Sequence, residues 1–175
     1  MKKDLIVLLA LLLLAALLIP GIDIKSVDEY YLLHAEDVNP GDPTVTVSVD
    51  ASAAVEAGGR TVTALLSLGD LPSDGVLLPE TTLVLREGDS AFGLFLRAAR
   101  LHKLTVEHEG SEKGPSGVYI KGINGLSEFS CGASSGWIFT VNGSAPKTSP
   151  SAYHPSDGDV IVWRYETDPN GFSGF

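Results

Sequence analysis

The last third of the chain holds the residue types that could do chemistry, so the first question is whether they form a catalytic set. Residues 132–136 read Gly-Ala-Ser-Ser-Gly, which fits the pattern of a nucleophile elbow. Such an elbow needs a strand before the serine and a helix after it, whereas Trp137–Val141 is typical of a strand. No Asp or Glu lies between Ser134 and His154 to complete a hydrolase triad. The pattern is better interpreted as a loop of small residues.

Other nucleophile and metal sites have little support. Cys131 is the single cysteine, and His154 could act as its base, but nothing in the sequence indicates a third residue to orient the imidazole. We therefore expect Cys131 to be a small structural side chain. Asp157 and Asp159 are more typical of a turn than of a calcium site. No ligand spacing for zinc is found among the four histidines, His34, His102, His108 and His154. The sequence predicts no enzyme, no metal and no cofactor.

Aromatic residues and glycines indicate a different kind of site. Rings beside glycine-containing loops suit the flat face of a ligand, with backbone groups at the rim for hydrogen bonds. The alternative is that the same rings alternate into the core of a small sheet, and both interpretations stay open. The rings in question are Tyr119, Phe129, Trp137, Phe139, Tyr153, Trp163 and Tyr165.

Short strands and one helix are the elements predicted to position these rings. The helix is expected from Ser90 to about His102, with Asp89 as its N-cap. Ala51–Arg60 is expected to be a loop, and Asn142-Gly143 favours a tight type I′ turn, which explains Asn-Gly-Ser without glycosylation. Alternation or β-branched composition predicts strands at 44–50, 61–68, 81–85, 104–108, 118–120, 137–141 and 160–165. The expected class is α+β, a small mixed sheet with one helix across a face.

The N-terminal sequence is typical of an export signal. Lys2 and Lys3 precede Leu5–Ile19, fifteen apolar residues that would form a helix about 22 Å long, shorter than a hydrocarbon core of about 30 Å. We predict a signal peptide or signal anchor at residues 1–21 and a tether at 22–43, followed by a folded domain at 44–167 and a flexible tail at 168–175. The domain is expected on the outer face of the cytoplasmic membrane or secreted. The formal net charge of −10 argues against binding to nucleic acid.

A series of short motifs resembles a known family. Over residues 44–166 the chain resembles the transcobalamin-like C-terminal domain family, a bacterial domain of unknown function related to the small domain of cobalamin carriers. The resemblance rests on Leu78-Pro79-Glu80-Thr81, Arg86-Glu87-Gly88-Asp89, Gly122-Ile123-Asn124-Gly125-Leu126, Cys131-Gly132, Ser135-Gly136-Trp137, Val141-Asn142-Gly143, Asp157-Gly158-Asp159 and Trp163.

This resemblance implies a β-grasp-like fold and a surface-exposed, non-catalytic module. In the carriers, the related domain covers one face of a corrin ring. Two features differ here: Thr148-Ser149-Pro150 stands where many relatives have a second cysteine, and the large helical domain of the carriers is missing. The resemblance therefore supports the fold more strongly than it supports cobalamin as the ligand.

The function expected from the sequence is a non-enzymatic, cell-surface binding module, with cobalamin or another corrinoid as the candidate ligand. Trp137 and Tyr153 would supply apolar contacts, while the backbone around Gly136, Asn142 and Gly143 would supply hydrogen bonds. A second surface protein would complete the site, because one domain covers only one corrin face. The alternative is an interaction or adhesion module that binds a protein or a cell-wall polymer.

Overall fold

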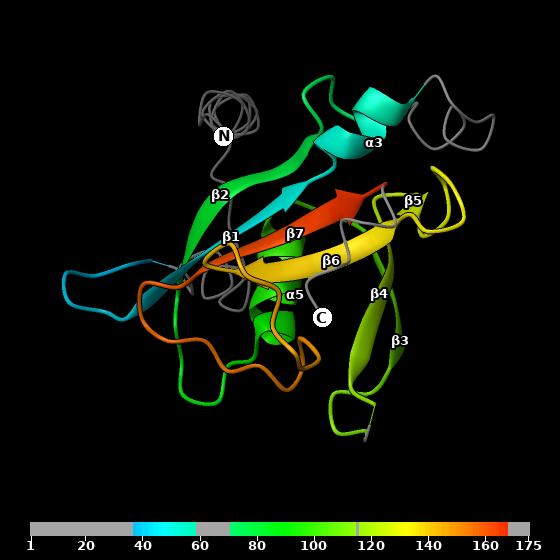
Figure 1. The fold of residues 1–175 in the computed structure, drawn as a ribbon. Helices are drawn as coiled ribbons and strands as arrows, with labels where there is room; N and C mark the ends of the chain where they lie inside the picture. Colours follow the sequence, from blue (N-terminus) through cyan, green and yellow to red (C-terminus); the bar gives the residue numbers. More distant parts are fainter. Residues whose placement is uncertain (1–36, 59–70, 115, 168–175) are drawn as a thin grey trace, which may run out of the picture. The chain divides into compact units, whose positions relative to one another are not determined.

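A computed structural model describes residues 37–58, 71–114 and 116–167 (Figure 1). The chain divides into two units, Met1–Glu36 and Asp37–Phe175, and all described residues belong to the second unit. The predicted export signal, the strand at 61–68 and the tail at 168–175 lie outside the described residues. Within the described part, no helix has both the length and the apolar character needed to span a bilayer.

The larger sheet is mixed, as predicted. It contains β1 (Thr44–Asp50), β2 (Val76–Val84), β6 (Gly136–Val141) and β7 (Val160–Glu166), in the spatial order β2-β1-β7-β6 (Figure 1). Strands β1 and β7 pair in parallel, whereas β1–β2 and β6–β7 are antiparallel. Residues of β1 alternate between buried and half-buried, which confirms the prediction from its period of two.

A second, smaller sheet packs beside the first. It consists of β3 (Val106–Gly110), β4 (Val118–Ile123) and β5 (Leu126–Ser127), all antiparallel. Two side chains of the larger sheet bond to its backbone: Trp137 Nε1 donates to Leu126 O at 2.8 Å, and Tyr165 Oη donates to Ser127 O at 2.8 Å. These bonds fix the two sheets against each other.

Helix α5 (Ala91–Leu101) covers the face of the larger sheet against which the small sheet also packs. Its Phe95 ring lies 4.5 Å from the ring of Trp163, centroid to centroid. The predicted N-cap was wrong by one residue, because Ser90 Oγ accepts the N–H of Gly93 and so caps the first turn. The helix itself is confirmed, and its inner face is formed by Ala91, Phe92, Leu94, Phe95, Ala98 and Ala99.

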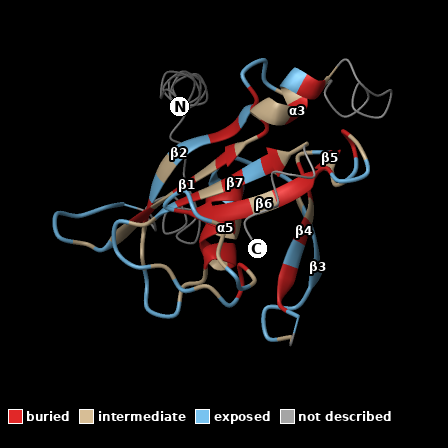
Figure 2. Ribbon diagram, in the orientation of Figure 1, coloured by how far each residue is buried: buried red, intermediate tan, exposed pale blue. Residues whose placement is uncertain are grey.

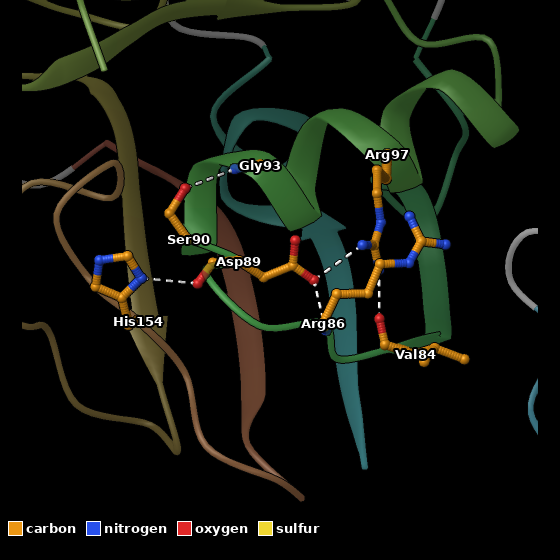
Figure 3. A network of polar contacts seen from close by, with 7 residues as sticks. All are labelled: Val84, Arg86, Asp89, Ser90, Gly93, Arg97 and His154. Carbon is orange, nitrogen blue, oxygen red and sulfur yellow. Dashed lines mark hydrogen bonds and ion pairs between the residues drawn. The ribbon is translucent and has the colours of Figure 1, made fainter. Parts of the chain in front are cut away.

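Asp89 instead joins the start of α5 to the strand before it (Figure 3). Its Oδ2 lies 2.9 Å from Arg97 Nη1 and accepts the Arg86 backbone N–H at 2.9 Å. Arg97 also donates to the carbonyl oxygen of Val84 at the end of β2. His154 donates its Nδ1–H to the carbonyl oxygen of Asp89 at 2.9 Å. This network fixes the 84–90 connection between strand and helix.

A second short helix, α3 (Ser52–Ala57), corrects the prediction of a loop at Ala51–Arg60. Small residues were interpreted as a loop, but alanine has the highest helix propensity. Ala54 and Ala57 are buried, so the helix is stabilised by packing as well as by propensity. The described residues thus contain two helices, where one was predicted.

Strand boundaries shifted where local signals conflict. The strand predicted at 81–85 begins at Val76 and includes Pro79, which an edge strand such as β2 tolerates because the missing N–H can face away from the sheet. The strand predicted at 104–108 was found at Val106–Gly110, after a helix end in which Lys103 adopts φ 57°. Strands β1, β4, β6 and β7 lie close to their predicted positions, whereas the two-residue strand β5 was not predicted.

The core lies between the larger sheet and the layer formed by α5 and the small sheet (Figure 2). Trp163 and Tyr165 of β7 are 2% and 1% exposed. Phe139 stacks on Trp163 with centroids 5.4 Å apart, and Trp137 meets Tyr165 edge to face at 5.1 Å. Most of the aromatic residues that could have formed a ligand face therefore belong to the core.

Candidate functional site

A hollow of about 290 Å³ lies where the two sheets meet. Its lining comes from segments far apart in sequence: Ser116, Val118–Ile120 of β4, Trp137–Phe139 of β6, Pro146, Thr148–Pro150 and Trp163 of β7. We call this feature the β4–β6 hollow. It exists because β4 belongs to the small sheet and β6 ends the large one, so the two strands do not pair.

The lining of the hollow is mainly apolar. Four aromatic side chains contribute to it, those of Tyr119, Trp137, Phe139 and Trp163. The indole N–H of Trp163 is buried and has no hydrogen-bond partner within the described residues. Such a surface favours contact with an apolar, flat group over contact with an ion.

Tyr119 forms the exposed rim and is 46% accessible. Its Oη donates to Glu128 Oε2 at 2.7 Å, and Lys121 Nζ lies 3.8 Å from the other oxygen of that carboxylate. Lys121 also contacts Glu109 at 2.9 Å. Burial, followed by the hydrogen bond to Glu128 and its negative charge, raises the pKa of Tyr119 to about 12. The rim phenol therefore stays protonated at neutral pH and is held in one orientation.

The loop that forms the opposite wall is fixed to β4 by close packing. Gly117 adopts φ +67°, and a Cβ placed there would lie 2.4 Å from Ser149 Cβ, so only glycine fits. Next to it, the Val118 N–H donates to Ser151 Oγ at 3.2 Å. Residues 146–150 are thus positioned by a contact with the start of β4.

One of the five predicted site residues, Trp137, lines the hollow. It is only 3% exposed, and its N–H is bonded to Leu126 O. Gly136 is buried at the start of β6, where a Cβ would lie 3.5 Å from Tyr119 Oη. Tyr153 does not line the hollow, although its ring meets that of Phe139 at 6.2 Å.

The other two, Asn142 and Gly143, lie at the far end of β6 and do not line the hollow. They have φ 51° and 78°, as a type I′ turn requires. The Asn142 side chain donates to Asp159 Oδ1 at 2.8 Å and accepts the Val160 N–H at 2.9 Å. Its amide is thus engaged in holding the turn against the start of β7.

Sequence reasoning missed the parts of the lining that are not aromatic or glycine. Ile120, Ile138, Pro146 and Pro150 carry no distinctive local signal, and their convergence depends on how the two sheets pack. Tyr119 is one of the seven aromatic candidates, and no feature of the sequence distinguishes it from the others. Its place in the lining depends on how β4 of the small sheet packs beside β6, which local patterns do not predict.

The residues considered for catalysis are used structurally. Cys131 is buried, and burial raises the pKa of its thiol, which disfavours the thiolate. The ring of His154 is instead bonded to Asp89 O. Asp157 Oδ1 accepts the Thr44 N–H at 2.7 Å, and Asp159 Oδ2 accepts the Ser156 N–H at 2.9 Å, so both act in the turn before β7. Residues 37–58, 71–114 and 116–167 contain no cluster of three or more metal-ligating side chains.

A comparison with family models finds a match in the C-terminal part of the chain. Residues 97–167 match a family model described as a domain of unknown function (DUF4430), which confirms the family expected from the motifs. The match begins inside α5 and does not include residues 44–96. A comparison with curated proteins found no match.

Two solved structures are similar to parts of this chain. One is haptocorrin in complex with Cbi, at a TM-score of 0.45 and 16% identity, covering 74% of this chain and 26% of haptocorrin. The other is a proposed metal-binding protein of Ruminococcus gnavus ATCC 29149, at a TM-score of 0.41 and 18% identity, covering 71% of this chain and 97% of that protein. This chain therefore spans about a quarter of the length of haptocorrin.

Proposed function

We propose that this chain, which carries a DUF4430 domain at residues 97–167, is a non-enzymatic binding module whose site is the β4–β6 hollow. The observation that carries the proposal is the convergence of four aromatic side chains on a concave surface of about 290 Å³. Hollows of this kind gain binding free energy by removing apolar ligand surface from water. The β-grasp-like fold and the exported location expected from the sequence are part of the same proposal.

The chemistry of the lining supports binding over catalysis. No carboxylate, imidazole, thiol or amine is among the side chains that line the hollow. The one titratable group, the Tyr119 phenol, has a pKa of about 12 and so is a poor proton donor or acceptor at neutral pH. A substrate held there would meet no acid–base pair.

The size of the hollow restricts the ligand. Pockets that enclose a whole small molecule usually measure about 300–1,000 Å³, so this one is at the lower limit. A corrinoid, the ligand class suggested by the family resemblance, would place only one edge and its side chains in the hollow. Most of its surface would remain for a second surface protein, which supports the expectation that a partner completes the site.

The test is a calorimetric titration of the full-length chain, held in mild detergent, with cobalamin and cobinamide. Tyr119→Ala should weaken binding about tenfold, because it removes an aromatic contact from the rim. Phe129→Ala is the matched control, since Phe129 is 59% exposed but does not line the hollow. Absence of saturable heat from the folded protein, or equal losses in both variants, would reject the corrinoid proposal.

A further inference from the structure

The outer edge of β6 is open. In the larger sheet β6 is the last strand, so no strand of the described residues pairs with its outer side. One isolated bridge, between Val141 and Ser144, occupies the C-terminal end of this edge. The rest of the edge borders the β4–β6 hollow, because Trp137–Phe139 contribute to the lining.

Strand register identifies which backbone groups point outward. Asn142 donates its backbone N–H to Val160 O at 2.9 Å, and the register continues with Thr140 opposite Val162. Inward-bonding positions alternate along an antiparallel strand, so every second residue bonds to β7. The intervening residues Trp137 and Phe139 therefore direct their N–H and C=O groups away from β7, toward the hollow.

The edge stays open because the hairpin that begins at the Asn142-Gly143 turn does not continue along β6. After the Asn142-Gly143 turn, Ser144 exchanges two backbone bonds with Val141, at 2.8 and 3.0 Å. Continuing this ladder would bring Pro146 opposite β6, but proline has no N–H to donate. The chain leaves the edge there and forms a wall of the hollow instead. Within the described part of the chain, the outer backbone groups of two β6 residues, Trp137 and Phe139, thus have no backbone partner beside this apolar surface.

We propose that this edge binds an extended, basic peptide segment of a partner protein, which adds to the sheet as a strand beside β6. Outward groups on a strand recur at roughly 6.6–6.8 Å, a spacing that another extended backbone repeats. Alternate side chains of the segment then enter the hollow. The inference goes beyond the small-ligand function, because the contact is made by the backbone of Trp137 and Phe139 and not by the rim ring of Tyr119.

The negative charge of the chain indicates which kind of partner would bind to this edge. The chain has a formal net charge of −10. Glu128, whose carboxylate also contacts Lys121 at 3.8 Å, lies beside the Gly136 end of the edge, its Cβ 3.8 Å from the position of a Gly136 Cβ. A second copy of this acidic chain would be repelled, whereas a basic segment is attracted over a long range. The occupant is therefore a segment of a different protein with lysine or arginine flanking apolar residues.

The test uses a probe peptide, acetyl-Lys-Val-Thr-Val-Lys-amide, titrated into the full-length chain in mild detergent. Two modified probes are compared with it. One is N-methylated at the central threonine and the other at both valines, so each lacks the N–H donors on one edge, and the two edges are opposite. Only one of the two modifications should weaken binding, by at least about tenfold, because it removes the hydrogen bonds that pair the probe with β6. On binding, the amide protons of Trp137 and Phe139 should become protected from exchange, whereas that of Thr140, already bonded to β7, should change little.

Because the protein is unaltered in this experiment, no loss of folding can obscure the result. Equal tolerance of both modifications, or no binding of the unmodified probe, overturns the proposal. If the amide protons of Trp137 and Phe139 are protected from exchange without probe and sedimentation shows a dimer, the proposal is overturned, and the edge is occupied by a second copy of this chain. None of these outcomes depends on whether a corrinoid binds, which the titration with Tyr119→Ala decides separately.

Discussion

The two tryptophans of this chain offer a direct test of how a buried hydrogen bond contributes to its stability. Trp137 and Trp163 lie on the neighbouring strands β6 and β7 and are 3% and 2% exposed. Trp137 Nε1 donates to Leu126 O at 2.8 Å, whereas Trp163 Nε1 has no partner among the described residues. Trp→Phe at either position removes the same atoms, so the loss of apolar burial is similar and the difference isolates the hydrogen bond.

We expect Trp137→Phe to lower the free energy of unfolding by about 2 kcal/mol more than Trp163→Phe does. Losing the bond leaves the carbonyl of buried Leu126 without this donor, which costs about 1–3 kcal/mol, whereas removing an unpaired buried N–H relieves a desolvation penalty. For a domain of this size, that difference corresponds to roughly 5–10 °C in the midpoint of thermal unfolding.

Urea unfolding of the full-length chain in mild detergent, followed by fluorescence, measures this difference. The chain contains two tryptophans, so each variant keeps one as the reporter. The slopes of the two transitions must agree for the comparison to be valid. Equal losses, or a larger loss for Trp163→Phe, would show that the bond from Trp137 to Leu126 contributes nothing and would refute the reasoning.

Two further predictions concern the walls of the hollow. Gly117→Ala should lower the free energy of unfolding by about 1–3 kcal/mol more than Gly88→Ala in the same urea assay. Both glycines have positive φ, but only at Gly117 would a Cβ meet Ser149 Cβ, at 2.4 Å. Equal losses of stability in the two variants would contradict this packing. For Tyr119, the folded-state pKa of about 12 exceeds the ordinary 10.0, so its contribution to stability is complete below about pH 10 and is lost as the pH rises through 12. Absorbance titration should show a lower pKa for Tyr119 in Glu128→Gln, and an unchanged curve would mean that burial alone causes the shift.

The elements could be predicted where one local signal dominates. Alternation along residues 44–50 and the spacing of Phe92 and Phe95 specify a strand and a helix without reference to the rest of the chain. The helix Ser52–Ala57 was missed because alanine, serine and glycine occur in both loops and short helices. What decides between them is the burial of Ala54 and Ala57, a tertiary contact.

The hollow could be predicted only in part, for the same reason. Aromatic residues contribute to the lining, and Trp137 is the one predicted site residue among them. Its other wall comes from β4 and residues 146–150, which meet β6 only because the small sheet stops short of pairing with the large one. No local sequence pattern predicts that the two sheets remain unpaired at this point. Tyr119 could therefore not be distinguished from the other aromatic residues.

The floor of the hollow is also the core of the domain, which links binding to stability. Trp163 and Phe139 line the hollow, and they stack on each other in the interior. Substituting either one would therefore weaken folding and binding together, and such a variant says little about function. Tyr119 differs because its side chain is half exposed, and its hydroxyl donates to Glu128. A ligand present at a hundred times its dissociation constant would stabilise the folded chain by about 2.7 kcal/mol, and Tyr119→Ala should reduce that gain, measured as the difference in stability with and without ligand for each variant.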